Sequence, residues 1–231
     1  MEHTGAHAAI GIILARGGSK GIPGKNLQHI GGVSLVGRAI QAADAAETIS
    51  TVLVSTDDAN IRKEAEHFGA HTVDRPSDLA GDNVTSEAAM VDALQQWEDL
   101  SEKRHGVVAL IQATSPFTTP NDIDRVIAPI REGNADSTLT VVDDYGYFWF
   151  KANNGWHLQH QLRDRRQHRL PWKRESGNVY AVRYDLFMRD GSLFPGRVQT
   201  VTIPPESAFE IDEPGELLTA KALNEHYQTS E

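Results

Sequence analysis

Apolar segments that suit buried strands alternate with amphipathic segments that suit helices along most of this chain. Continuous apolar runs favour strands at residues 9–15, 50–56, 106–112, 137–142, 177–183 and 197–203. Apolar residues that recur about every 3.6 positions favour helices at residues 34–47, 59–68, 86–102, 120–132 and 214–227. Apolar strands separated by helices usually form a parallel sheet between two helical layers. The alternation therefore predicts a three-layer α/β fold with a mostly parallel sheet.

Residues 143–174 interrupt this alternation. The stretch is rich in aromatic residues, arginine and histidine and has no helical periodicity, so we expect a small insertion within a single domain over residues 1–231. Its run YGYFWF, residues 145–150, is too aromatic to lie in water on a monomer, which predicts a homodimer held partly by the insertion. His157, His160 and His168 do not favour a zinc site, because they lie in an irregular segment of a chain without cysteine.

Charge and cysteine content exclude several classes of function. The 32 acidic side chains outnumber the 22 of lysine and arginine, and the net charge of −10 argues against non-specific binding to nucleic acid or to an anionic membrane. The lack of cysteine excludes disulfides and thiolate chemistry. No apolar run approaches the roughly 20 residues that span a bilayer, and the first residues do not follow the pattern of a signal peptide. We therefore expect a soluble, cytoplasmic protein.

A basic, glycine-rich loop, LARGGSKGIPGKN at residues 14–26, follows the first predicted strand. Glycine lets backbone amides approach a ligand closely, and lysine and arginine neutralise anionic oxygens. In an acidic protein such a loop indicates a pocket for a small anion, and ligands of parallel sheets bind beyond the carboxyl ends of the strands. The loop therefore predicts a phosphate-binding nest. The alternative is a flexible connection between strand and helix whose charges are solvated.

The loop matches neither of the two common phosphate-binding motifs. A Walker A loop has four residues between its first glycine and Gly-Lys, followed by serine or threonine. Here five residues separate Gly18 from Gly24, and Asn26 takes the position of the hydroxyl. The dinucleotide-binding motif fails at Ser19, where it needs a second glycine. We therefore expect a phosphate-binding loop of another kind.

Several segments, in chain order, resemble the acylneuraminate cytidylyltransferase family, whose members are also called CMP-sugar synthetases. They are the loop LARGGSKGIPGKN and then VSTDD, RPSDLAGDNVTS, LIQATSP, RQHRLPWKRESGNVYA and FEIDEPGEL, which together extend over nearly the whole chain. Asn26 separates the loop from that of the related Kdo cytidylyltransferases, which usually have proline after Gly-Lys. The resemblance implies a Rossmann-like nucleotidyltransferase fold with a small inserted dimerisation subdomain.

The resemblance also implies an activity, a cofactor and binding partners. Members of this family transfer CMP from CTP to the anomeric hydroxyl of a sialic-acid-like keto-sugar acid and release pyrophosphate. We therefore expect CTP and an anionic sugar acceptor as substrates. We expect Mg²⁺ as the cofactor, with Mn²⁺ as a substitute, because magnesium prefers oxygen ligands and bridges to substrate phosphates.

The predicted CTP site lies mainly in the glycine-rich loop. The cations expected to neutralise the triphosphate and support catalysis are Arg16, Lys20 and Lys25. The backbone expected to line the phosphate cradle belongs to Ala15, Gly17, Gly18 and Ser19. By resemblance, Asn26, Arg75 and Ser86 hold the cytidine. Two alternatives stay open, a surface arginine for Arg75 and a helix N-cap for Ser86.

Two carboxylates of the late acidic segment form the predicted metal site. Glu210 and Asp212 are two positions apart, so an extended segment places them on one face. The resemblance assigns magnesium binding and a catalytic role to Asp212, with Glu210 as the second ligand. Asp212 also precedes Glu213 and Pro214 and so has the sequence of a helix N-cap, an alternative that the residues leave open.

The acceptor side follows the family pattern less closely than the nucleotide side. By resemblance, Gln112 contacts the acceptor sugar and Arg166 binds its anionic group, because a planar guanidinium suits a carboxylate. The positions at which the pattern departs are Phe117, Thr118, Ser176 and Glu210. These departures leave open another anionic acceptor, such as a phosphonate, and a nucleotide-binding regulator without turnover. A glycosyltransferase of similar fold is a third alternative.

Overall fold

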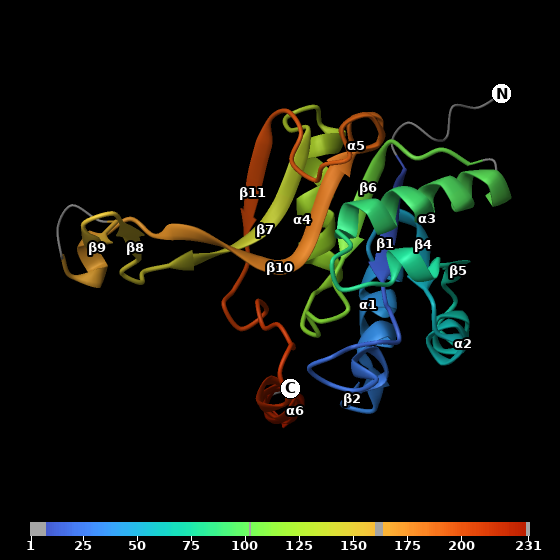
Figure 1. The fold of residues 1–231 in the computed structure, drawn as a ribbon, viewed down its shortest axis with the longest axis horizontal. Helices are drawn as coiled ribbons and strands as arrows, with labels where there is room; N and C mark the ends of the chain where they lie inside the picture. Colours follow the sequence, from blue (N-terminus) through green and yellow to red (C-terminus); the bar gives the residue numbers. More distant parts are fainter. Residues whose placement is uncertain (1–7, 102, 160–163, 230–231) are drawn as a thin grey trace.

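The computed structural model describes residues 8–101, 103–159 and 164–229, and it shows a central sheet between two layers of helices (Figure 1). The strands of the sheet are β1 (Ala9–Leu14), β4 (Ile49–Thr56), β5 (His71–Asp74), β6 (Val107–Ile111), β7 (Ser137–Asp144), β10 (Trp172–Arg183) and β11 (Val198–Thr202). They lie in the order β11-β7-β10-β6-β1-β4-β5. Neighbouring strands are parallel except where β10 pairs with β6 and β7. The predicted three-layer α/β fold with a mostly parallel sheet is confirmed.

Helices cover both faces of the sheet. They are α1 (Leu35–Asp44), α2 (Ala59–His67), α3 (Ser86–Ser101), α4 (Pro120–Arg131), α5 (Tyr184–Asp190) and α6 (Pro214–Thr229). One face packs against α1, α2 and α4, and the opposite face packs against α3 and α5. In β1, Ala9 and Ile13 belong to the first core and Ile10 and Ile12 to the second, so this apolar strand is buried on both sides. No helix in the described part of the chain is both long and apolar enough to cross a bilayer.

The predicted strands and helices are all present, and the elements without a predicted counterpart are short. β10 differs most from its prediction, because it begins at Trp172 and not at residue 177. The predicted end of α3, residue 102, lies outside the described residues. β5 is an edge strand with one buried residue, and α5 spans seven residues, so neither is long enough to show a clear period. The remaining short elements of the described residues are β2 (His29–Ile30), β3 (Val33–Ser34), β8 (Trp149–Ala152), β9 (Gly155–Leu158), η1 (Lys25–Leu27), η2 (Ser77–Leu79) and η3 (Arg166–His168).

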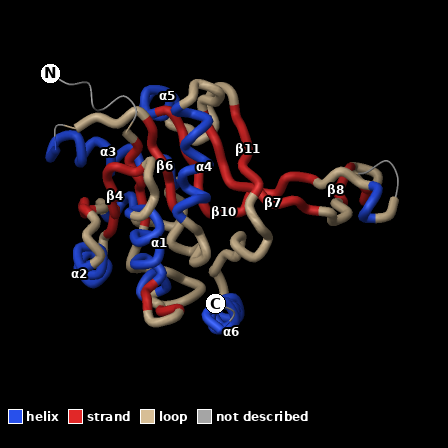
Figure 2. The backbone as a smooth tube through the Cα atoms, turned by 180° about the vertical axis from the view of Figure 1, so that it is seen from behind, coloured by secondary structure: helices blue, strands red, loops and turns tan. Residues whose placement is uncertain are grey.

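An arm, of which residues 143–159 and 164–174 are described, projects from the body of the molecule (Figures 1 and 2). At its base β7 and β10 stay paired, with Trp172 opposite Asp144 and Arg174 opposite Val142. Beyond the base, β8 (Trp149–Ala152) and β9 (Gly155–Leu158) form a small antiparallel sheet, and η3 follows. Because the chain returns along the arm and not through a crossover helix, β10 runs antiparallel to β7.

The last helix packs near the glycine-rich loop. Residues 203–213 form a linker from β11 to α6, which lies beside β2 at one end of the molecule (Figure 1). A small separate core joins this region to the loop, and its members are Ile22, Ile30, Leu35, Ile211, Leu217 and Ala220. Burial of these side chains brings the late acidic segment next to a loop from the start of the fold.

Candidate active site

The glycine-rich loop leaves the carboxyl end of β1 and borders a cavity of about 460 Å³, which we call the phosphate-side cavity after the group that the sequence predicts for it. The predicted site residues in its lining are Arg16, Ser19, Lys20, Lys25, Asn26 and Asp212. The cations predicted for the triphosphate thus meet the predicted metal ligand in one place. This position agrees with the general rule that ligands bind beyond the carboxyl ends of parallel strands.

Hydrogen bonds hold the loop in a defined conformation. Asn26 is buried, and its Nδ2 donates to the backbone carbonyl of Arg16 at 2.9 Å. The backbone N–H of Gly17 donates to Oδ1 of Asp57 at 2.9 Å. Gly24 has a φ of 60°, in the left-handed region that favours glycine. Asn26 therefore supports the backbone of the cradle as well as lining the cavity.

Each cation of the loop has an acidic partner within the protein. Arg16 Nη2 lies 2.9 Å from Oδ1 of Asp82, and Lys20 Nζ lies 2.5 Å from Oδ2 of the same carboxylate. Lys25 Nζ lies 2.9 Å from Oδ1 of Asp212. The side chain of Lys25 is 15% exposed, against 31% for Arg16 and 80% for Lys20. Because water screens it least, Lys25 is the cation whose charge acts most strongly on a bound anion.

A second cavity of about 220 Å³, the base-side cavity, adjoins the first. Its lining includes Arg75 and Ser86, which were predicted to hold the cytidine, and Gln112, which was predicted to contact the acceptor. The two cavities share Leu14, Arg16 and Asp82 in their linings. Together they form a cleft with the cationic loop at one end and Arg75 at the other.

Two alternatives from the sequence are wrong. Arg75 is not a surface residue, since it is 8% exposed and its Nη2 donates to the backbone carbonyl of Ser55 at 2.7 Å. Burial lowers the pKa of Arg75, and a nearby aspartate opposes this shift. Ser86 is the first residue of α3, and it is the hydroxyl of Thr85 that accepts from the backbone N–H of Ala88 at 3.2 Å. Thr85 therefore caps this helix, while Ser86 lines the base-side cavity.

The linker before α6 carries Glu210 and Asp212. Glu210 accepts a hydrogen bond from Oγ1 of Thr114 at 3.4 Å, and a Cβ at Gly177 would lie 3.1 Å from its Oε2. Partial desolvation of the carboxyl group and repulsion from Asp212 raise the pKa of Glu210, although the residue as a whole is exposed. The two carboxylates thus lie close enough to influence each other, and Asp212 lines the phosphate-side cavity.

The donor chemistry of these carboxylates fits a magnesium ion. Magnesium takes oxygen ligands and usually keeps waters and substrate phosphates, so one or two protein carboxylates suffice. Within the described ranges, no group of three or more His, Cys, Asp or Glu side chains has the arrangement of a metal site. His160 lies outside the described residues. Asp212 and Glu210 therefore suit a metal whose other ligands come from a phosphate and from water.

The side chain of Asp212 does not cap α6. Oε2 of Glu216 accepts from the backbone N–H groups of Asp212 at 2.7 Å and of Glu213 at 2.8 Å. The carboxylate of Asp212 accepts from Lys25 instead. A Cβ at Gly21 would lie 2.3 Å from the carbonyl oxygen of Asp212, so only glycine lets the loop approach this segment so closely. The N-cap alternative for Asp212 is wrong.

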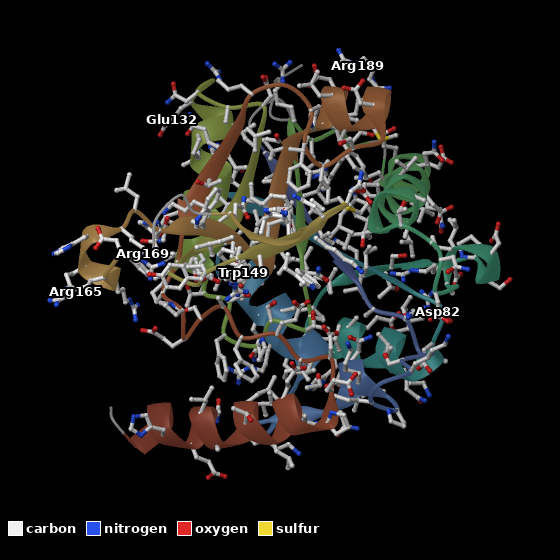
Figure 3. The ribbon with its side chains drawn as sticks, turned by 60° about the vertical axis from the view of Figure 1, so that its left-hand side comes forward. Asp82, Glu132, Trp149, Arg165, Arg169 and Arg189 are labelled. Atoms are coloured by element: carbon white, nitrogen blue, oxygen red, sulfur yellow. The ribbon has the colours of Figure 1, made fainter. Side chains whose placement is uncertain are left out.

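Arg166 lies in the arm, away from both cavities. It begins η3, and its Cζ lies 4.6 Å from the centroid of the Tyr145 ring. Figure 3 labels Asp82, at the cavities, and Arg165, the neighbour of Arg166, on opposite sides of the view. Within one chain, Arg166 therefore lies apart from Gln112, which lines the base-side cavity. The acceptor role of Arg166 stays a prediction.

Two departures from the family pattern are accommodated inside the protein. Ser176 is buried, and its Oγ donates to Oγ1 of Thr140 at 2.7 Å. The ring of Phe117 packs against Phe209, with 6.4 Å between the centroids. Neither Ser176 nor Phe117 lines the two cavities. These substitutions therefore do not remove a polar group from the cleft.

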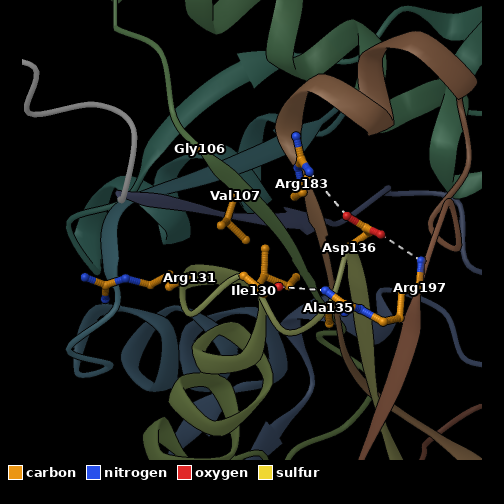
Figure 4. A pocket seen from close by; sticks show the side chains of 9 residues that line it. Gly106, Val107, Ile130, Arg131, Ala135, Asp136, Arg183 and Arg197 are labelled. Atoms are coloured by element: carbon orange, nitrogen blue, oxygen red, sulfur yellow. Dashed lines mark hydrogen bonds and ion pairs between the residues drawn. The ribbon is translucent and has the colours of Figure 1, made fainter.

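A third cavity of about 340 Å³ lies near the starts of β6 and β7, at the end of these strands opposite to their carboxyl ends (Figure 4). Its lining includes Arg131, Arg183 and Arg197. Arg183 and Arg197 interact with other groups of the protein. Arg183 lies 3.3 Å from Asp136, and Arg197 Nη2 donates to the carbonyl of Gly133 at 2.6 Å. None of the predicted site residues lines this cavity, so we do not consider it the active site.

Asp82 and Glu216 belong to the site but were not predicted. Glu216 had a signal, because an acidic residue in the first turn of a helix often accepts from the backbone at the helix start. Asp82 had none, because nothing in the local sequence shows that its carboxylate faces Arg16 and Lys20.

This chain is similar in sequence to known proteins over most of its length. Residues 10–228 match the family model described as cytidylyltransferase. N-acylneuraminate cytidylyltransferase A of Danio rerio is 31% identical over 208 residues, which cover 87% of this chain and 47% of the relative. N-acylneuraminate cytidylyltransferase of Oncorhynchus mykiss is 34% identical over 144 residues, which cover 62% of this chain and 32% of the relative. The chain thus spans about half the length of the first relative and about a third of the second.

A solved structure of similar shape supports the fold. It is CMP:2-keto-3-deoxy-manno-octonic acid synthetase complexed with CTP, with a TM-score of 0.70 and 18% sequence identity. The match covers 95% of this chain and 99% of that chain. At this identity the likeness shows a shared fold, and the predicted nucleotidyltransferase fold is thereby confirmed.

Proposed function

This chain belongs to the cytidylyltransferase family, and on that basis we propose that it transfers CMP from CTP to the anomeric hydroxyl of a sialic-acid-like keto-sugar acid. Pyrophosphate is the second product. The observation that supports the proposal best is the cleft of two adjoining cavities, with the cations of the loop at one end and the buried Arg75 at the other. The acceptor class rests on the names of the curated relatives.

In this proposal CTP lies along the cleft. The triphosphate occupies the phosphate-side cavity beside Lys20 and Lys25, and the cytidine occupies the base-side cavity near Arg75 and Ser86. Arg16 lines both cavities and so contacts the phosphates nearest the nucleoside. Charged donors make shorter and stronger hydrogen bonds to phosphate oxygens than neutral donors do, which explains why the cations gather at one end.

The reaction is an in-line displacement at the α-phosphorus of CTP. The acceptor oxygen forms a bond to phosphorus, the bond from phosphorus to the bridging oxygen of pyrophosphate breaks, and the hydroxyl proton is released to water. Such transfers depend mostly on positioning and on neutralisation of charge. Lys25 and the other loop cations supply fixed positive charge beside the leaving pyrophosphate, and Gln112 orients the acceptor.

We also propose Mg²⁺ as the cofactor, with Mn²⁺ as a substitute, held by Asp212 and Glu210. A bound ion supplies further positive charge to the triphosphate oxygens. Desolvation raises the pKa of Glu210, and the positive charge of Lys25 opposes this rise. Glu216 keeps the backbone of Asp212 in place through its hydrogen bond to the Asp212 N–H.

The arm supports a homodimer in this proposal. Tyr145 and Tyr147 interact with cations of the arm itself, because the guanidinium groups of Arg166 and Arg169 lie over their rings. Among the described residues of the arm, the exposed large apolar side chains are Trp149, Phe150, Trp156, Leu170 and Trp172. A second copy of the chain covers this surface, and its cleft is where Arg166 meets an acceptor. The cytoplasmic location stays a prediction from the sequence.

Light scattering at micromolar concentration should give a mass near twice the 25.4 kDa of one chain. The reason is that Trp149 is 54% exposed and Trp156 is 66% exposed on one small arm, which is unfavourable in water. The variant with both Trp149→Lys and Trp156→Lys should shift toward the monomer mass. Leu218→Lys, at a leucine of α6 that is 69% exposed, is the matched control and should leave the mass unchanged. A monomeric wild-type protein would refute the dimer.

Pyrophosphate release should be fast only when CTP and a sialic-acid-like keto acid are present together. The measurement is a panel of all four nucleoside triphosphates against sugar acids, with a phosphonate and other anionic hydroxyl compounds included. CTP binding without release in any mixture would indicate a nucleotide-binding regulator. Consumption of a nucleotide sugar would indicate a glycosyltransferase. Release with the phosphonate alone would keep the cytidylyl transfer and change the acceptor class.

A further inference from the structure

Asp82 lies at the junction of the two cavities and contacts two cations of the phosphate site. Its Oδ1 lies 2.9 Å from Arg16 Nη2, and its Oδ2 lies 2.5 Å from Lys20 Nζ. The residue lies in the segment between η2 and α3 and is 40% exposed at its side chain. Asp82 and Arg16 are both members of the shared lining of the two cavities. The ion pair between them therefore stands where a ligand that spans the cleft must pass.

We propose that Asp82 is an internal counter-ion that occupies the triphosphate cradle when no nucleotide is bound and that an incoming triphosphate displaces. This inference rests on the proposed function, because it takes the phosphate-side cavity as the site of the triphosphate. The carboxylate offers Arg16 and Lys20 the same kind of anionic oxygens as a phosphate does. The two anions compete for the same donors, so one must leave when the other binds.

The surroundings of Asp82 suit a displaceable group. Hydrogen bonds from Lys20 and from Arg16 hold the pKa of Asp82 below its ordinary value, so the carboxylate stays ionised at neutral pH. Arg16 does not depend on Asp82 for its position, because its Nη1 also donates to the backbone carbonyl of Ala80 at 3.2 Å. Arg16 therefore stays at the cleft after the carboxylate leaves.

Competition of this kind lowers the affinity of every ligand that must displace Asp82, and it does so by the same factor for each ligand. The apparent affinity of a ligand falls in proportion to the fraction of molecules in the competent state. CTP and inorganic tripolyphosphate both need the cradle cations, so removal of the Asp82 charge should tighten both equally. Cytidine lacks phosphates and does not need those cations, so its affinity should not change. Exposed ion pairs are individually weak, so the expected gain is roughly 3- to 30-fold.

The experiment compares wild type, Asp82→Asn and Asp78→Asn by calorimetric titration with CTP, tripolyphosphate and cytidine. Asp78 is exposed, lies in η2 shortly before Asp82 in the chain, and lines neither cavity, so Asp78→Asn removes the same charge without opening the cradle. Titrations are made first with a chelator and then with magnesium. Asp82→Asn should bind CTP and tripolyphosphate more tightly under both conditions, and Asp78→Asn should match wild type.

Three outcomes would overturn the proposal. Unchanged tripolyphosphate binding by Asp82→Asn would show that the carboxylate does not compete. Weaker binding of CTP or tripolyphosphate under either condition would show that Asp82 assists the ligand, for instance by holding a metal. An equal gain in affinity in Asp78→Asn would show that the effect comes from the overall charge of the protein and not from the cradle. A wild-type protein that binds tripolyphosphate but not CTP would contradict the proposed function alone, because tripolyphosphate tests the cradle without the nucleoside.

Discussion

Replacement of Lys25 by alanine should lower the rate of CMP transfer with every acceptor by roughly two orders of magnitude or more. Lys25 is the least exposed of the loop cations and lines the phosphate-side cavity. A charge-assisted contact in such a preorganised site contributes about 2–4 kcal/mol to the transition state. Because the triphosphate is common to all acceptors, the loss should not depend on the acceptor.

The Lys25→Ala experiment needs a check on folding and a matched control. Asp212, the partner that loses its cation, has a side chain that is 62% exposed, so no buried charge is left unpaired. The melting temperature should therefore stay near that of wild type. Lys63→Ala, at an exposed lysine of α2, removes the same charge far along the chain and should keep full activity. Lys20→Ala should lose less than Lys25→Ala, because Lys20 is 80% exposed. An unchanged rate of pyrophosphate release in Lys25→Ala would refute the phosphate cradle.

Replacement of Asp212 by asparagine should leave stability near wild type and lower activity roughly 100-fold at ordinary magnesium concentrations. Stability is spared because Glu216, and not the Asp212 side chain, accepts from the backbone at the start of α6. Activity falls because asparagine cannot supply the negative charge that a magnesium ligand provides. Extra magnesium or manganese should restore part of the rate.

The measurements for Asp212→Asn are thermal unfolding and a magnesium titration of pyrophosphate release. Glu206→Gln, at an exposed position of the same linker, is the matched control and should follow the wild-type titration. Full activity of Asp212→Asn with an unchanged magnesium dependence would show that the metal is held elsewhere. A large fall in the melting temperature would show that the Lys25–Asp212 pair holds the fold together.

The sequence by itself determined the class of fold, because a buried strand or helix can be recognised from the spacing of the apolar side chains along it. The apolar run at residues 9–15 predicts a strand covered on both faces, and β1 contributes to the cores on both sides of the sheet. The sequence also predicted that the loop cations line one pocket, since they are near one another along the chain and directly follow that strand, and they do line the phosphate-side cavity. Such features need only the period of the side chains and the rule that ligands bind at the carboxyl ends of parallel strands.

The tertiary structure alone decided which distant groups meet. Lys25 and Asp212 are 187 positions apart, and only the packing of α6 against the loop brings them into contact. The same packing shows that Asp212 is not a helix cap, although its sequence context suits one. The direction of β10 and the position of Arg166 depend on the path of the arm, for which the sequence has no period. Local patterns record which side of an element is buried, whereas an ion pair depends on how whole elements pack, and that is the outcome of all the core contacts together.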